Sequence, residues 1–319
     1  MRPHDDTLRI RTIVFPTDGS VWAESAFAQA AFYAANHDAT LHMLTVAHGR
    51  QLAPPVTNAG SAAFRTRVQE AAVDTAGFEF VQAGVTAPSP EEGILDYAER
   101  VDADLVVMGT KGRGGLDRLV MGSVAEAVVR QASCPVLTVG PTAEHAPARA
   151  RRILVPTDFS DGSYVALAHA LRLARLHRAE VALVHVVEAH AETGLGIEVI
   201  GWGENAPHRV DEARAALREL IDDVGVPEVP VEYYALIGLP APGVLGTAER
   251  LGADLVVMGT HGRTGVRRLL MGSVAEKVVQ FAPCPVFVVK PTGKLLLPAA
   301  ADRDPAPLEV ARDPVVVPL

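Results

Sequence analysis

Apolar positions along the first half of the chain fall into short continuous runs that alternate with longer stretches of helical spacing. The runs of strand length are RTIVFP (11–16), TLHMLTV (40–46), FEFVQA (78–83), DLVVMG (104–109) and PVLTV (135–139). The stretches with helical period and composition are 20–37, 61–76, 89–101 and 123–132. Five strands that alternate with four helices predict an α/β fold with an open, mostly parallel sheet and right-handed crossovers.

The second half repeats this order. Residues 103–139 and 253–289 are identical at about 26 of 37 positions. Near the front of each half, IVFPTDGS ends at Ser20 and ILVPTDFS ends at Ser160. These two anchors leave about ten extra residues in the middle of the second half. We expect this insertion at GLGIEVIGWGENAP, residues 194–207.

The repeating unit has the size of a whole domain rather than of a solenoid repeat. We expect a first domain at 1–140, a linker at 141–151, a second domain at 152–290 and an irregular tail at 291–319. The linker and the tail are assigned on their proline-rich, aperiodic composition.

The formal net charge is −9, which gives no support for a broad nucleic-acid surface. No apolar run is long enough to span a bilayer, and the N-terminus has no apolar signal core. Cys134 and Cys284 stand at equivalent places without metal-ligand spacing, so we expect two small buried hydrophobes and a reducing, cytoplasmic location. His42, His48 and His185 also lack metal-ligand spacing, so no metal site is expected.

One glycine pattern occurs in both halves. G-x2-G-x9-G-S runs from Gly109 to Ser123 and again from Gly259 to Ser273. Its first glycine ends a predicted strand, and its last glycine precedes a predicted helix. Ligands of open parallel sheets bind outside the carboxyl ends of strands, and a helix N-terminus offers N–H groups to phosphate. The pattern therefore favours a phosphate site in each half.

A purely structural interpretation of these residues stays open. Ser123 with Glu126, and Ser273 with Glu276, fit a capping box at the start of a helix. Asp18 fits the N-cap of the helix that follows it. The sequence matches neither the P-loop pattern G-x4-G-K-[ST] nor the dinucleotide pattern G-x-G-x-x-G.

On the glycine pattern, on PTDFS after the first strand and on HVVE after the second, the chain resembles the universal stress proteins, specifically the ATP-binding type with tandem domains. The resemblance covers nearly all of 9–140 and 151–290. It implies two open five-stranded parallel-sheet domains, Rossmann-like and of the adenine nucleotide alpha hydrolase type. It also implies one ATP site in each domain, with Mg²⁺ as a candidate ion beside the phosphates.

The resemblance assigns binding roles residue by residue. The residues expected to contact the adenine, ribose or phosphates in the first domain are Pro16, Thr17, Asp18, Val46, Gly109, Thr110, Gly112, Arg113, Gly122, Ser123 and Val124. Their counterparts in the second are Pro156, Thr157, Asp158, Val186, Gly259, Thr260, Gly262, Arg263, Gly272, Ser273 and Val274. Val46 and Val186 each follow their aspartate by 28 residues. Lys111 and His261 are equivalent, and both are expected to be exposed.

Three functions remain in competition. The first is a nucleotide-responsive stress or regulatory module. The second is a slow ATPase or phosphotransferase, with Asp18 and Asp158 holding Mg²⁺ near the phosphates, although no general base is evident. The third is a structural partner protein that binds no nucleotide. In this family the last strand often pairs domains, so CPVLTVG and CPVFVVK are expected to pair within the chain, and a homodimer is plausible.

Overall fold

The computed structural model describes residues 8–48, 78–111, 121–143, 146–188, 191–192, 198–199, 206–224, 229–260 and 271–297. The helix predicted at 61–76 lies outside these residues, as does most of the predicted insertion. Two short strands pair antiparallel here, β8 (Ala191–Glu192) just before the predicted insertion and β9 (Glu198–Val199) within it.

The described elements of the first repeat follow the predicted order. They are β1 (Thr12–Pro16), α1 (Val21–His37), β2 (Thr40–His48), β3 (Phe80–Ala87), α3 (Pro90–Arg100), β4 (Leu105–Gly109), α4 (Ser123–Gln131) and β5 (Val136–Val139). The strand predicted at 78–83 was placed too early. β3 continues through Gly84 because it pairs with β2 from Leu41 to His48, and this ladder outweighs the weak strand propensity of glycine.

The second repeat has the same succession. Its elements are β6 (Arg152–Pro156), α5 (Asp161–His177), β7 (Glu180–Val187), α6 (Ala206–Val224), β10 (Val231–Ile237), α7 (Pro240–Leu251), β11 (Leu255–Gly259), α8 (Ser273–Phe281) and β12 (Val286–Val289). The central strands β6, β11 and β12 are nearly continuous in buried apolar residues, because both of their faces are covered, whereas the edge strand β10 is more exposed.

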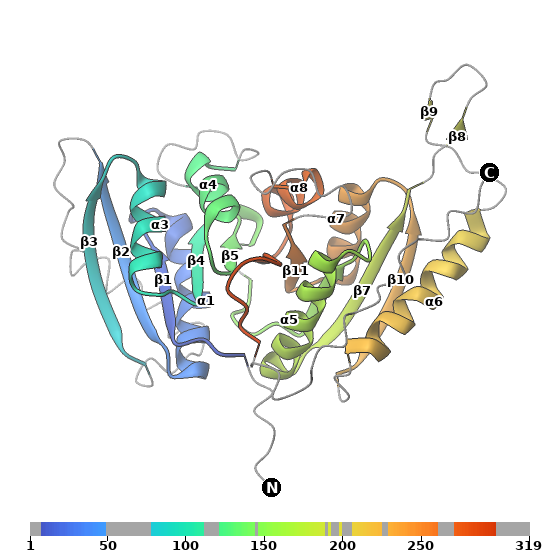
Figure 1. Cartoon of the computed structure of the whole chain (residues 1–319), viewed down its shortest axis with the longest axis horizontal. Helices are drawn as coiled ribbons and strands as arrows, with labels where there is room; N and C mark the ends of the chain where they lie inside the picture. Colours follow the sequence, from blue (N-terminus) through green and yellow to red (C-terminus); the bar gives the residue numbers. More distant parts are fainter. Residues whose placement is uncertain are drawn as a thin grey trace, which may run out of the picture.

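The large strands of both repeats form one sheet. Its order is β10-β7-β6-β11-β12-β5-β4-β1-β2-β3, and every pairing in it is parallel except the one between β12 and β5. At that seam Phe287 pairs with Leu137, so the two repeats meet edge to edge at their last strands. Figure 1 shows the resulting twisted sheet crossing the whole molecule.

Two buried layers cover the faces of this sheet, and each layer contains residues of both repeats. One lies under α1 and α5, where Tyr33 approaches Phe287 at a ring-centroid distance of 6.3 Å. The other lies under α3, α4, α7 and α8 and includes Cys134 and Cys284. Both cysteines are buried free thiols, as predicted, and burial raises their pKa values to about 11 and about 12.

The described segments after β5 and β12 pack against the rest of the protein. After β5 comes a short 3-10 turn, Pro141–Ala143, and then Ala148 and Ala150, which are buried beside α5. After β12, Lys294 Nζ contacts carboxylate oxygens of Asp102 and Asp104 in the first repeat. The start of the predicted tail, residues 291–297, is irregular, yet it packs against the first repeat. We call this segment the strap.

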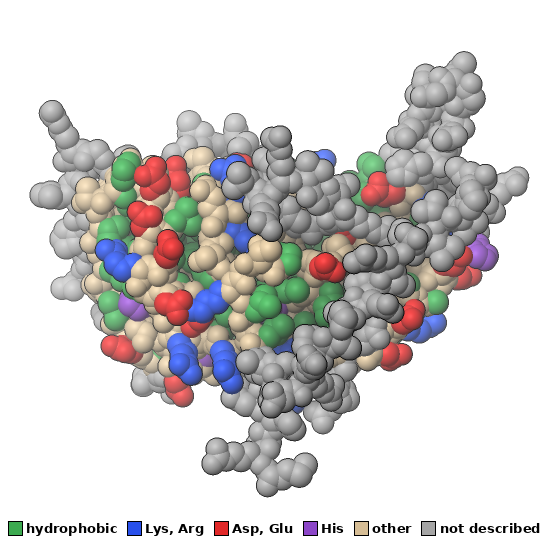
Figure 2. Space-filling view, in the orientation of Figure 1, with side chains coloured by type: hydrophobic (Ala, Val, Ile, Leu, Met, Phe, Trp, Pro, Cys, Tyr) green, Lys and Arg blue, Asp and Glu red, His purple; other side chains and the backbone are tan. Residues whose placement is uncertain are grey.

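No helix among the described residues is long and apolar enough to cross a bilayer. On the face shown in Figure 2, acidic and basic side chains of the described residues are interspersed. The described residues of that face therefore present no extended surface of positive charge.

Candidate functional site

The register of the sheet brings the predicted site residues of the first repeat to one edge. β1 pairs in parallel with β2 on one side and with β4 on the other. Continuing these registers beyond the last pairs places Asp18 level with Val46 and Thr17 level with Gly109. The 28-residue spacing from Asp18 to Val46 is the register of β1 on β2, in which Thr12 pairs with Thr40.

The second repeat has the same arrangement. β6 pairs with β7 in the same 28-residue register and with β11 on its other side. Asp158 is thereby level with Val186, and Thr157 is level with Gly259. Each repeat therefore collects a threonine, an aspartate, a valine and a glycine at the carboxyl ends of three neighbouring parallel strands, which is where ligands of such sheets bind.

Side chains fold the chain after β1 into a tight turn. The Thr17 N–H donates to Leu44 O (2.8 Å), which continues the ladder by one bond. The Thr17 hydroxyl oxygen then accepts from Gly19 N (3.0 Å), and Asp18 Oδ1 accepts from Ser20 N (2.9 Å). Gly19 has a φ of 73°, a left-handed value that suits glycine. The turn places the Asp18 carboxylate at the exposed edge of the sheet.

The same turn in the second repeat contains a phenylalanine where the first has Gly19. Phe159 has a φ of 63°, an uncommon value for a bulky residue. Its N–H donates to Thr157 Oγ1 (3.0 Å), and its ring lies 4.6 Å from that of His185. His185 Nδ1 donates to Thr157 O (2.8 Å), so the histidine fixes the turn. The alignment of TDGS with TDFS puts Phe159 opposite Gly19, but it does not show that Phe159 keeps the left-handed φ.

Asp158 is not a helix N-cap. The N-cap of α5 is Ser160, whose side chain accepts from Ser163 N. Asp158 Oδ1 accepts instead from Ser160 N (3.1 Å) and from the Ser160 hydroxyl (2.6 Å). In the first repeat α1 begins at Val21, so Asp18 also precedes the cap position.

The capping-box interpretation of Ser123 and Ser273 is wrong. The N-caps of α4 and α8 are Gly122 and Gly272, and neither cap has a side-chain hydrogen bond. Each serine is instead the first residue of its helix, and it is exposed. The first turns of both helices therefore present backbone N–H groups that no cap side chain covers, at the positive end of the helix dipole.

Glycine is required in this region by close backbone contacts. A Cβ on Gly122 would lie 3.1 Å from Thr110 O, the atom that accepts the Gly122 N–H at 2.8 Å. A Cβ on Gly259 would lie 2.9 Å from the carbonyl oxygen of Gly162, in the first turn of α5. These contacts bring main chain of neighbouring segments together at the sheet edge.

Other predicted residues divide into three groups. Val46 and Val186 contact the first turns of α3 and α7, since a Cβ on Gly93 or Gly243 would approach the valine side chains to 2.5 and 2.9 Å. Thr110 and Thr260 are buried, and Lys111 is only 8% exposed, so its predicted exposure was wrong. The positions outside the described residues are Gly112, Arg113, His261, Gly262 and Arg263.

A comparison with known families matches residues 9–140 and 149–290 to the Universal stress protein family. A universal stress protein of Methanocaldococcus jannaschii is 39% identical over 143 residues, which are 44% of this chain and 82% of that protein. One of Mycolicibacterium smegmatis is 29% identical over 301 residues, which are 88% of this chain and 97% of that protein.

Among solved structures, a universal stress protein from Archaeoglobus fulgidus superposes with a TM-score of 0.62 at 21% identity. The match covers 88% of this chain and 98% of that one. At this identity the likeness concerns the fold, and it extends over both repeats.

Proposed function

The chain belongs to the universal stress protein family, and from that premise we propose that it binds adenine nucleotide, ATP foremost, at one site in each domain. The domains are those expected from the repeat, 1–140 and 152–290, joined by the linker at 141–151. In this proposal the protein is a cytoplasmic, nucleotide-responsive module of the stress response rather than an enzyme with rapid turnover.

The observation that carries the proposal is the uncapped start of α4 and of α8 at the carboxyl edge of the sheet. Backbone N–H groups of the first turn and the helix dipole together favour a phosphate chain. Gly122, Ser123 and Val124 would hold the phosphates in the first domain, and Gly272, Ser273 and Val274 in the second. The close packing at Gly122 and Gly259 fits a site that a ligand approaches along the main chain.

The neighbouring strands supply groups that suit a nucleoside. Asp18 and Asp158 would accept hydrogen bonds from ribose hydroxyls, because a carboxylate is a strong acceptor. Val46 and Val186 would offer apolar contact to adenine. Mg²⁺, where present, would enter with the triphosphate, and its preferred ligands are oxygens such as those of the phosphates and of these carboxylates.

A titration with ATP tests the proposal. Asp18→Asn and Asp158→Asn keep an oxygen that can accept from Ser20 N or Ser160 N, so each turn can form without the charge. We expect each substitution to weaken one of two sites by roughly tenfold or more, since a hydrogen bond to a charged group contributes about 1.5–3 kcal/mol.

The matched control is Asp96→Asn, an exposed aspartate on α3, which should leave both sites unchanged. Absence of binding at millimolar ATP in the unsubstituted protein would contradict the proposal. Equal weakening by the control and by the site variants would show that general charge, and not the two turns, governs the affinity.

A further inference from the structure

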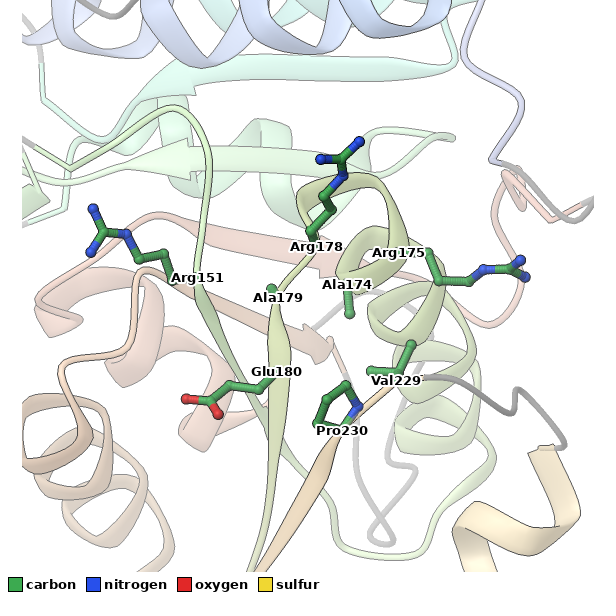
Figure 3. Close-up of a pocket in the computed structure, with 8 residues that line it drawn as sticks. All are labelled: Arg151, Ala174, Arg175, Arg178, Ala179, Glu180, Val229 and Pro230. Carbon is green, nitrogen blue, oxygen red and sulfur yellow. The ribbon is translucent and has the colours of Figure 1, made fainter.

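A cavity of about 640 Å³ lies in the second domain, at the sheet edge opposite to the glycine pattern. Its walls come from the end of α5, the start of β7 and the residues just before β10 (Figure 3). The lining residues are Arg151, Ala174, Arg175, Arg178, Ala179, Glu180, Val229 and Pro230. Volumes of this order hold small-molecule ligands.

The cavity combines an apolar centre with a rim of arginines. Figure 3 shows Ala174, Ala179 and the Val229–Pro230 pair in the middle, with the three arginine side chains extending on different sides of them. The carboxylate that lines the cavity, that of Glu180, is paired with Arg152, which is not a lining residue. The charge that the rim offers to a ligand is therefore positive.

The first domain provides an internal comparison. Arg151, Arg175, Arg178 and Glu180 align with the positions 140 residues earlier, which are Arg11, Ala35, Asp38 and Thr40. The registers confirm this alignment, because β1 pairs with β2 as β6 pairs with β7. Only the counterpart of Arg151 is basic in the first domain. The cluster is thus a property of the second domain and not of the fold.

Arg178 ends α5 in a left-handed backbone conformation, as its counterpart Asp38 does after α1 in the first domain. Arg178 is the C-cap of α5 with a φ of 56°, in the left-handed region that glycine occupies most easily. At the end of α7 the same role falls to Gly252, with a φ of 59°. A residue other than glycine occupies this left-handed position in both domains, and it is an arginine only in the second.

The positive charge of the arginine rim favours an anionic ligand. The chain has a formal net charge of −9, yet three arginines line this one cavity. Guanidinium groups match phosphate and carboxylate oxygens in a two-pronged geometry.

We propose that this cavity binds a small soluble molecule with at least two anionic groups of the phosphate type, separate from the two nucleotide sites. The arginines at 151 and 178 contact the anionic groups from two sides, and the alanine, valine and proline floor takes a short apolar part of the ligand. The site is specific to the second domain.

Titration with inorganic pyrophosphate, followed by amide NMR of the full chain, tests the proposal. We expect shifts at the amides of Arg178–Val181 and of Val231, which border the cavity. Shifts at Ser123 and Ser273 would report the nucleotide sites instead, so the two sites are read separately. Raising the salt concentration should weaken the cavity signal, because exposed ion pairs are screened.

The test variant is Arg151→Ala with Arg178→Gly, in which glycine also relieves the left-handed φ, so that folding is not threatened. The matched control is Arg214→Ala, a half-exposed arginine on α6 outside the cavity. Affinity at the cavity amides should fall at least about tenfold in the double variant, an equivalent of about 1.4 kcal/mol, and stay unchanged in the control.

Three results would overturn the proposal. Pyrophosphate could leave the cavity amides of the unsubstituted protein unshifted. Their shifts could persist with unchanged affinity in the double variant. Binding could also be seen only to vesicles of phosphatidylcholine and phosphatidylserine and not to pyrophosphate, which would identify a lipid surface as the anion.

Discussion

Gly259 lies where the end of β11 meets the first turn of α5. A Cβ there would come within 2.9 Å of the Gly162 carbonyl oxygen and 3.0 Å of its carbon. Backbone atoms cannot rotate aside as a flexible side chain can, so the helix start itself would have to shift. The glycine is needed for this contact, at a residue that also borders the proposed nucleotide site.

Gly259→Ala should therefore destabilise the protein by about 1–3 kcal/mol, the usual cost of forcing extra atoms into a packed site. Urea unfolding measures this. Gly246→Ala on α7 is the matched control, because nothing lies within 4 Å of its added Cβ. There alanine should stabilise by up to about 1 kcal/mol through helix propensity. Equal effects of the two substitutions would contradict the close-contact account.

At the scale of single residues, the sequence shows where the glycines of the site stand, but it predicts burial and backbone conformation less well. The repeated glycines pointed to the strand end and the helix start, and both positions are as predicted. The burial of Lys111 and the left-handed φ of Phe159 were not predicted. Local sequence says little about either, since each depends on neighbours that the fold brings from elsewhere, such as His185 on β7.

The strap after β12 is an element without helix or strand that ties the repeats together. Lys290 Nζ donates to Ala132 O, and Lys294 N donates to Ser133 O. Lys294 Nζ lies 2.7 Å from Asp104 Oδ1 and 2.9 Å from Asp102 Oδ1. Leu296, which is 1% exposed, follows in the core. A composition rich in proline predicts an irregular backbone, but it carries no information about these partners.

Lys294→Met keeps most of the side-chain volume and removes the charge. It should cost about 1–2 kcal/mol of unfolding free energy, because the Asp104 carboxylate is largely buried and loses a charged donor. Urea unfolding of this variant beside Lys277→Met, an exposed lysine on α8, checks the expectation. A loss no greater than that of the control would mean that the Lys294 ammonium group does not help to hold the strap.

Across the whole molecule, α1 and α5 meet around a buried histidine. His177 Nδ1 accepts from Ala150 N (3.0 Å), so its proton resides on Nε2, which donates to the Tyr33 hydroxyl oxygen (3.1 Å). Its ring stacks on Phe32 at 4.8 Å. Burial, with help from the nearby Arg149 and His37, lowers the pKa of His177 to about 3. The neutral ring of His177, in the second repeat, is thus hydrogen-bonded to Ala150 in the predicted linker and to Tyr33 in the first repeat.

The protein should therefore lose stability in acid below pH 6.5. Between pH 6.5 and about 3 the unfolded chain binds a proton at His177 and the folded chain does not, so stability falls as the pH falls. The slope from this group approaches about 1.4 kcal/mol per pH unit. His169, whose pKa burial lowers to about 4, adds to it.

Urea unfolding at several pH values measures this slope. His177→Gln should lower stability at pH 7 and flatten the decline between pH 6.5 and 4. His208→Gln, an exposed residue on α6, should leave the profile unchanged. An undiminished slope in the His177 variant would contradict the assigned role.

The proposal of two nucleotide sites rests on the equivalence of the two halves, and counting bound nucleotide tests it most directly. Native mass spectrometry of the full chain, with ATP at a concentration just sufficient to fill both sites of the unsubstituted protein, reports the number of ligands per polypeptide. We predict two adenine nucleotides per chain, falling to one in Asp158→Asn. No bound nucleotide at millimolar ATP, or an unchanged count in that variant, would contradict the account.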